Sequence, residues 1–153
     1  MRKSVDLLFL TIADPFMVGV YEDNKLIDTI KSELKSSEAL PILYKKLEGL
    51  YDIKRLIYVN GPGSFMAIKV TYIFLKTISI LKDIPLLAID GFYFNDNRPI
   101  KAIAKLHFVK ISSQIETIKL DEVVVNDFKF LDLLEEKYLT KDAAPLYAIG
   151  AIG

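Results

Sequence analysis

The chain has 153 residues, of which 52% are hydrophobic and 26% are charged. This length suits one domain with a substantial core, and the composition excludes a disordered polyelectrolyte. Lysine plus arginine and aspartate plus glutamate number 20 each, so no overall charge favours nucleic acid or an anionic membrane as a partner. The chain lacks cysteine, which excludes disulfides and cysteine metal sites and favours a cytoplasmic protein.

The first third of the chain predicts three strands and a helix. Strand-forming residues fill 5–12, 17–21 and 26–30, which we interpret as a meander that contains a hairpin. Asp6 interrupts the first apolar run, so we expect a strand there rather than a signal peptide. A helix-start signal followed by apolar residues three and four apart predicts a helix over 37–50.

A glycine-rich turn organises the middle of the chain. A strand predicted over 55–60 leads into Gly61-Pro62-Gly63-Ser64-Phe65. The glycines permit unusual backbone angles, the proline fixes its own φ, and the serine is a preferred N-cap. A helix over 65–81 and a strand over 84–89 are predicted to follow. This order favours a right-handed crossover between two parallel strands.

The remainder of the chain predicts a smaller second lobe. Its expected elements are strands over 100–109 and 115–120, a short helix over 128–138 and an extended segment over 144–147. We expect an N-terminal lobe, 1–98, and a reduced C-terminal lobe, 99–153, packed as one globular unit. The element order is that of the ribonuclease-H-like unit of the actin-like ATPase superfamily. We therefore predict an α/β fold with a mixed five-stranded sheet and flanking helices.

The residues around the turn also resemble a known family. Gly61-Pro62-Gly63-Ser64-Phe65 and the later Pro85-Leu86-Leu87-Ala88-Ile89 look like the corresponding segments of the bacterial TsaB (YeaZ) family. Leu40-Pro41 in the preceding helix and the late Pro145-Leu146-Tyr147 also have counterparts there. The resemblance covers the N-terminal lobe well and the remainder weakly.

The resemblance implies a cytoplasmic, non-catalytic subunit in the synthesis of threonylcarbamoyladenosine, a modification beside the anticodon of tRNAs. Its partner would be a TsaD-like subunit, which carries the metal and the transferase chemistry and is bound through the two helices of the N-terminal lobe. A TsaE-like ATPase in a larger complex and a homodimer through the same helices are further implied partners. Contact with tRNA is expected only through the complex, and no cofactor or membrane is expected.

Several positions depart from the family pattern. Met66, Ala67, Ile68 and Lys69 stand where the family commonly continues with Thr, Gly, a variable residue and Arg. Thr11 stands where the superfamily usually has an Asp that helps to hold metal-bound phosphate, which argues against nucleotide hydrolysis. A small nucleotide-binding ATPase or phosphotransferase of the same superfamily remains the alternative function.

Catalytic and metal sites have little support in the residues. Gly61, Gly63 and Ser64 are weak candidates for an anion site, because a glycine turn at a helix N-terminus favours negative charge. Pro62 removes one donor and no P-loop lysine follows, so we favour a structural turn. Pro62 also stands where a nucleophile elbow needs glycine, which argues against a serine peptidase. The one histidine, His107, lies in a predicted strand and is expected to be structural.

The helix over 65–81 is apolar on every side, with Lys69 and Lys76 as its internal charges. One sheet cannot cover such a helix, so we expect it to meet the helix over 37–50 and a partner protein. Tyr72→Glu is expected to weaken that association and to leave the fold largely intact. The expected partner-binding residues are Leu40, Leu43, Tyr44, Leu47, Phe65, Met66, Lys69, Tyr72, Ile73 and Lys76.

Overall fold

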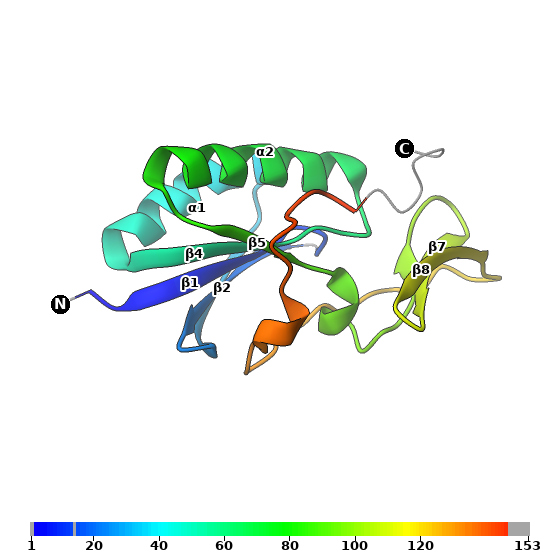
Figure 1. The fold of residues 1–153 in the computed structure, drawn as a ribbon. Coiled ribbons are helices and arrows are strands. Elements are labelled where there is room, and N and C mark those ends of the chain that lie inside the picture. Colours follow the sequence, from blue (N-terminus) through cyan, green and yellow to red (C-terminus); the bar gives the residue numbers. More distant parts are fainter. Residues whose placement is uncertain (1, 14, 147–153) are drawn as a thin grey trace.

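Figure 1 shows a central sheet with two helices on one face. The computed structural model describes residues 2–13 and 15–146. The sheet has five strands in the order β3-β2-β1-β4-β5, and β1 is antiparallel to β2 but parallel to β4. The predicted mixed five-stranded sheet is therefore confirmed. Its strands are β1 (Ser4–Leu10), β2 (Phe16–Glu22), β3 (Lys25–Ser32), β4 (Asp52–Val59) and β5 (Leu86–Ile89).

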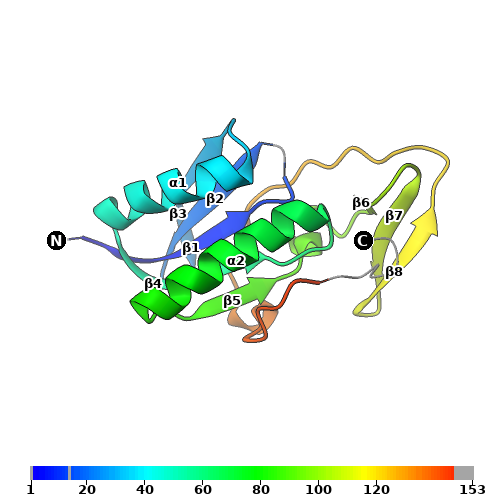
Figure 2. The same ribbon diagram turned by 90° about the horizontal axis from the view of Figure 1, so that it is seen from above.

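The central strand β1 contributes to two cores. Leu7 and Phe9 face the core beneath the helices, whereas Leu8 and Leu10 face the core on the opposite side of the sheet. This division arises because successive side chains of a strand point to opposite faces. The helices are α1 (Ser36–Leu50) and α2 (Phe65–Lys82). They lie side by side over the sheet, as Figure 2 shows from above.

The predicted parallel crossover consists of β4, α2 and β5. Leu56 of β4 lies opposite Leu86 of β5, and Val59 lies opposite Ile89. The carboxyl ends of β4 and β5 therefore lie at the same end of the sheet. The glycine-rich turn lies at this end of the sheet, next to the loop that follows β1.

The second half of the chain begins with a short helix and a small sheet. Its elements are the 3₁₀ helices η1 (Gly91–Phe94) and η2 (Glu136–Tyr138) and the strands β6 (Ile100–Lys101), β7 (Leu106–Ile111) and β8 (Gln114–Lys119). These three strands form an antiparallel sheet beyond one end of the main sheet (Figures 1 and 2). The single strand predicted over 100–109 is wrong, because a tight turn containing Ala104, at φ 51°, separates β6 from β7.

The helix predicted over 128–138 is also wrong. Only Glu136–Tyr138 forms a 3₁₀ turn, and the chain before it is not helical. Its backbone bonds to the main sheet instead, since the Leu26 N–H donates to the Asp132 carbonyl at 2.9 Å. Tertiary packing therefore overrides the local apolar pattern. The residues that pack into the second core are Phe128, Phe130, Leu131 and Leu134. Tyr147, at the end of the predicted extended segment, lies outside the described residues.

A charged cluster holds this C-terminal segment against the sheet. Arg55 of β4 lies 2.7 Å from the Asp6 carboxylate and 2.9 Å from that of Glu136. Asn24 accepts a hydrogen bond from Arg55 at 3.2 Å and donates one to Glu136 at 3.2 Å. The hydrogen bond from Arg55 lowers the pKa of Glu136. The cluster thus joins β1, β4 and the C-terminal segment on the sheet face opposite the two helices.

Candidate functional site

The glycine-rich turn connects three segments of the chain. Gly61 has φ +125°, a conformation that favours glycine. Its carbonyl accepts a hydrogen bond from the Gly91 N–H at 2.8 Å, and the Asn60 carbonyl accepts one from the Leu146 N–H at 2.7 Å. The Asn60 side-chain amide donates to the Ala144 carbonyl at 3.0 Å. The turn therefore joins the end of β4 to the segment after β5 and to the C-terminal segment.

Ile12 fills the space beside two glycines. A Cβ added to Gly63 would lie 2.7 Å from Ile12 Cγ2, and one added to Gly91 would meet Ile12 Cδ1 at a still shorter distance. Glycine at both positions thus lets the β1–β2 loop pack closely against the turn. Of the predicted anion-site residues, Gly63 serves this packing, whereas a Cβ at Gly61 would meet the Leu146 carbonyl oxygen at 3.0 Å. Ser64 is exposed and caps α2, accepting a hydrogen bond from the Ala67 N–H at 3.4 Å.

Thr11 follows β1 directly and is only 5% exposed. Its Oγ1 has no hydrogen-bond partner among the described residues. A threonine hydroxyl is uncharged at neutral pH, so it cannot hold metal-bound phosphate as a carboxylate does. Within residues 2–13 and 15–146, no three acidic or histidine side chains are grouped to hold a metal ion.

His107 is completely buried in β7. Its Nε2 accepts a hydrogen bond from the Val124 N–H at 3.0 Å, and its Nδ1 lies 2.8 Å from the Lys105 carbonyl oxygen. Since Nε2 is an acceptor, Nδ1 carries the proton and donates. Both nitrogens are engaged with backbone, which agrees with the predicted structural role and leaves neither available as a base.

The four partner-binding residues predicted on α1 lie in the core. Each is at most 9% exposed, and all belong to the cluster between the helices and the sheet. Tyr44 packs edge-on against Phe74 of α2, with 6.1 Å between ring centroids. Burial raises the pKa of Tyr44 to about 12. The prediction is corrected accordingly, because these residues hold α1 on the sheet and leave almost no surface for a partner: Leu40, Leu43, Tyr44 and Leu47.

The residues predicted on α2 are mostly exposed. Tyr72 is the exception, since it is half-buried and packs against Tyr58 with 6.0 Å between ring centroids. Tyr72→Glu would therefore also disturb the core, and Ile73, which is 54% exposed, offers a cleaner substitution. No helix in the described part of the chain is long and apolar enough to cross a membrane. The exposed residues are Phe65, Met66, Lys69, Ile73 and Lys76.

Ile80, which is 70% exposed, extends this surface along α2. Met66, Ile73 and Ile80 recur every seven residues, with Lys69 and Lys76 between them. Alternating steps of three and four place all five side chains in one row, here named the α2 stripe. Among the described residues, no carboxylate lies within 4.0 Å of either lysine amino group. The α2 stripe is thus apolar and positively charged.

Solved structures with a similar fold come from Pseudomonas aeruginosa. One is an uncharacterized protein with similarity to peptidase YeaZ, which matches 80% of this chain and 69% of its own at 14% identity and a TM-score of 0.61. Another is YeaZ itself, which matches 80% of this chain and 70% of its own at 13% identity and a TM-score of 0.61. The chain has the YeaZ fold. No protein-family model and no curated protein matches the sequence.

The predicted α/β fold with a mixed five-stranded sheet and flanking helices is confirmed, and these solved structures share that fold. The expected partner-binding set omitted some exposed apolar residues of the two helices. Ile80 could have been identified from the seven-residue recurrence that starts at Met66. The other exposed apolar residues of the two helices are Ile42, Leu50 and Leu81, for which the sequence pattern offers no comparable signal.

Proposed function

We propose that this chain is a TsaB-like, non-catalytic subunit that binds a TsaD-like transferase and supports threonylcarbamoyladenosine modification of tRNA. The observation that carries the proposal is the exposed α2 stripe on a YeaZ fold. The TsaD-like partner would present an equivalent pair of helices, and the two pairs would pack into a helical bundle. Contact with tRNA and with any TsaE-like ATPase would occur in the larger complex, in the cytoplasm.

The chemistry of the α2 stripe supports a helical partner. Met66, Ile73 and Ile80 are 63%, 54% and 70% exposed. Full burial of such side chains contributes about 1.5–3 kcal/mol each, which helps to offset the cost of association. A seven-residue recurrence lets one helix pack along another over several turns. The intervening lysines favour acidic residues at the facing positions of the partner.

A homodimer through the same stripe is the competing assembly. In an interface between two copies, Lys69 and Lys76 of one copy would approach the same residues of the other. Like charges across an interface are unfavourable. We therefore expect self-association to be weaker than association with an acidic partner helix.

The turn supports a binding subunit rather than the nucleotide-binding alternative. Ile12 occupies the space beside Gly63 that an open phosphate cradle would need. Thr11 supplies a hydroxyl where the superfamily uses a carboxylate. Calorimetry with ATP and magnesium distinguishes the two functions, because micromolar binding by the isolated chain would favour the alternative.

Co-purification of the full chain with a TsaD-like protein of the same organism tests the proposal. We expect a stable heterodimer in size-exclusion chromatography. Ile73→Glu should raise the Kd at least about tenfold, because it buries a charge in the interface. Ile111→Glu on β7 is a matched control, since Ile111 is 56% exposed and lies outside the two helices.

Circular dichroism and thermal melting would establish that both variants remain folded. Absence of any complex with the unmodified chain would contradict the proposal. Equal weakening by Ile73→Glu and Ile111→Glu would contradict the role of the α2 stripe.

A further inference from the structure

The strand β8 forms one edge of the small sheet, whose strand order is β6-β7-β8. Figure 2 shows this sheet beyond one end of the main sheet, with β8 as its outermost strand. In the described chain β8 pairs with β7 only. An edge strand presents a row of backbone N–H and C=O groups with which another strand can pair. The free edge of β8 is therefore a template for an additional strand.

Alternate residues of β8 direct their backbone groups away from β7. The N–H of Leu120, directly after β8, donates to the Lys105 carbonyl at 2.9 Å, so Leu120 bonds towards the β7 side. Hydrogen-bonded and non-hydrogen-bonded residues alternate along an antiparallel pair, and the register of β7 and β8 has no shift. Among the described residues, the outward-facing backbone groups form no hydrogen bond. They belong to Ile115, Thr117 and Lys119.

Two of the other three edge strands offer little free backbone. Ala88 of β5 exchanges two backbone hydrogen bonds with Thr140, at 2.9 and 2.8 Å. The C-terminal segment thus covers part of β5, which has only four residues. At the other edge of the small sheet, β6 has only two residues. Neither edge could pair with a long strand.

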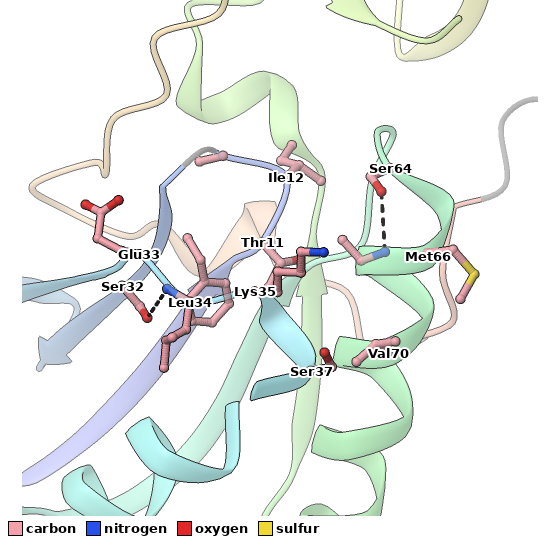
Figure 3. Close-up of a pocket in the computed structure, with 13 residues that line it drawn as sticks. Thr11, Ile12, Ser32, Glu33, Leu34, Lys35, Ser37, Ser64, Met66 and Val70 are labelled. Atoms are coloured by element: carbon pink, nitrogen blue, oxygen red, sulfur yellow. Dashed lines mark hydrogen bonds between the residues drawn. The ribbon is translucent and has the colours of Figure 1, made fainter. Parts of the chain in front are cut away.

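The remaining edge strand, β3, is covered at one end and blocked by its own side chains. The Leu26 N–H donates to the C-terminal segment, and the Thr29 N–H donates to Asp28 Oδ1 at 2.9 Å. Where the chain leaves β3, the Leu34 N–H donates to Ser32 Oγ at 3.2 Å, which Figure 3 shows as a dashed line. Proteins protect edge strands from pairing with other chains by covering or interrupting them. The six residues of β8 contain neither a proline nor a bulge.

Local sequence holds β8 extended without a further partner. Ser112 and Ser113 connect it to β7 with φ of 50° and 67°, as in a type I′ turn, whose twist matches that of paired strands. Five of the six β8 residues are exposed. The strand is thus ordered before association, which lowers the entropic cost of binding. Its β-branched residues, which favour a strand, are Ile115, Thr117 and Ile118.

We propose that β8 pairs antiparallel with β8 of a second copy of this chain, with the two-fold axis at Thr117. In this register Thr117 lies opposite Thr117 of the other copy, and Ile115 lies opposite Lys119. All outward-facing residues of both strands then form hydrogen-bonded pairs, and the two small sheets become one continuous sheet. Paired threonines are a favourable cross-strand combination.

The sequence of β8 distinguishes this register from its neighbours. Outward-facing groups can meet only in registers that differ by two residues. A shift of two in one direction places Glu116 opposite Glu116 of the other copy, which is unfavourable. A shift in the other direction places Ile115 opposite Asp121, which lies beyond the strand. The register centred on Thr117 has neither defect, so β8 is complementary to itself.

The charges of β8 agree with this register. Its charged residues are Glu116 and Lys119. With residues about 3.4 Å apart along a strand and strands about 4.8 Å apart, Lys119 lies about 6 Å from Glu116 of the other copy, Cα to Cα. The two Glu116 residues are about 8 Å apart and the two Lys119 residues about 14 Å apart. Opposite charges are thus closer than like charges, although their side chains lie on opposite faces of the sheet.

This pairing goes beyond the proposed function, because it uses neither α1 nor α2. The α2 stripe remains free for a different partner. An interface of one strand pair is small, so we expect a dimer with a micromolar or weaker Kd.

Sedimentation of the full chain from micromolar to millimolar concentration tests the proposal. We expect a monomer–dimer equilibrium. Amide hydrogen exchange should slow with rising concentration at Ile115, Thr117 and Lys119, because only the dimer bonds these groups. Glu116 and Ile118 should be protected at every concentration, because they bond to β7. A chain that stays monomeric at millimolar concentration would overturn the proposal, as would a dimer without the added protection.

A charge exchange at Thr117 tests the axis. Thr117→Lys and Thr117→Glu should each weaken dimerisation severalfold, because each places like charges opposite one another. An equimolar mixture of the two should associate at least as tightly as the unmodified chain. Thr117→Val keeps a β-branched side chain and is the matched control, which should still dimerise. Folded variants whose mixture does not associate would overturn the two-fold pairing and would favour a foreign extended segment on β8.

Thr117→Pro tests the contribution of the backbone. Proline removes an N–H that β7 does not use, so the variant should fold but dimerise at least about tenfold more weakly. Circular dichroism establishes whether it folds, and the charge exchange decides the question if it does not. Ile73→Glu in the α2 stripe should leave this dimer unchanged. Self-association that survives Thr117→Pro and is lost in Ile73→Glu would overturn the proposal in favour of a dimer through α2.

Discussion

The helices α1 and α2 lie on the same face of the sheet but present different surfaces. On α1 the apolar residues that recur at spacings of three and four are buried, including Leu40 and Leu47, at 1% and 0% exposed. On α2 buried Ile68 and Leu75 face the protein, while the α2 stripe faces outward. The comparison shows that α1 is an ordinary amphipathic helix, whereas α2 has an apolar face that the rest of the described chain does not cover.

The difference has a physical cause. A helix on a sheet buries one face, roughly a third of its circumference, and solvent favours polar residues elsewhere. Each isoleucine of the α2 stripe therefore departs from the usual pattern, whereas the exposed surface of α1 includes Lys45 and Lys46. Contiguous exposed apolar surface of this kind marks an interaction site.

Leu47→Ala should give the largest effect and would define the buried side of α1. Leu47 is completely buried, so the substitution should lower the free energy of unfolding by about 2–5 kcal/mol. Urea denaturation measures this loss. Ile42→Ala on the exposed side of α1, where Ile42 is 59% exposed, should change it by less than about 0.5 kcal/mol. Similar losses in the two variants would contradict the orientation of α1.

Gly63→Ala tests the turn that starts α2, and its expected loss is about 1–3 kcal/mol. The new methyl group would clash with Ile12. Combining it with Ile12→Ala should recover part of the loss attributable to the clash. Gly49→Ala in α1 is the control, because an added Cβ there would meet nothing within 4 Å. This substitution should raise the free energy of unfolding by about 0.5–1 kcal/mol, because alanine favours a helix more than glycine does. Chemical denaturation of the unmodified protein and of these three variants measures the differences in the free energy of unfolding.

The pH dependence of stability provides a second test of the buried side of α1. The pKa of Tyr44 is raised to about 12 in the folded protein, against about 10 in an unfolded chain. Its contribution to stability is therefore complete below pH 10 and is lost as the pH rises towards 12. Tyr44→Phe should show a shallower loss of stability over that interval in urea denaturation. Parallel pH profiles for the two proteins would contradict the burial of the Tyr44 hydroxyl.

Ile80→Ala should give the smallest change in stability and would define the exposed side of α2. Ile80 is 70% exposed, so thermal melting should reveal a change of less than about 0.5 kcal/mol. The affinity for a TsaD-like protein should nevertheless fall severalfold, because apolar contact with the partner is lost. A large loss of stability would mean that Ile80 belongs to the core of the isolated chain.

Local patterns predicted most elements of residues 1–98. The strands, both helices and the turn at Gly61 follow from periodicity and from the conformational preferences of glycine, proline and serine. The prediction of a helix over 128–138 was wrong because the apolar residues of this segment pack into the core on the sheet face opposite α1 and α2. Its backbone forms hydrogen bonds with β3 instead of with itself. Hydrogen bonds between segments far apart in the sequence cannot be predicted from a local residue pattern.

The candidate site was predictable only in part. The apolar surplus of α2 pointed to a partner surface, but the same argument included Leu43 and Tyr44 of α1, which are buried. The roles of Ile12 and Thr11 required the folded chain, because one fills the space beside Gly63 and the other has a buried hydroxyl without a hydrogen-bond partner among the described residues.

The sequence by itself determined the order and type of the main elements, the departure at Thr11 and the excess of apolar residues on α2. It did so because helix and strand periodicities are properties of neighbouring residues. Tertiary structure alone decided which apolar faces are covered, how Ile12 packs on the turn and that the Thr11 hydroxyl has no hydrogen-bond partner among the described residues. Those outcomes depend on contacts between segments far apart in the chain, and burial is determined by what packs against a residue rather than by its neighbours in sequence.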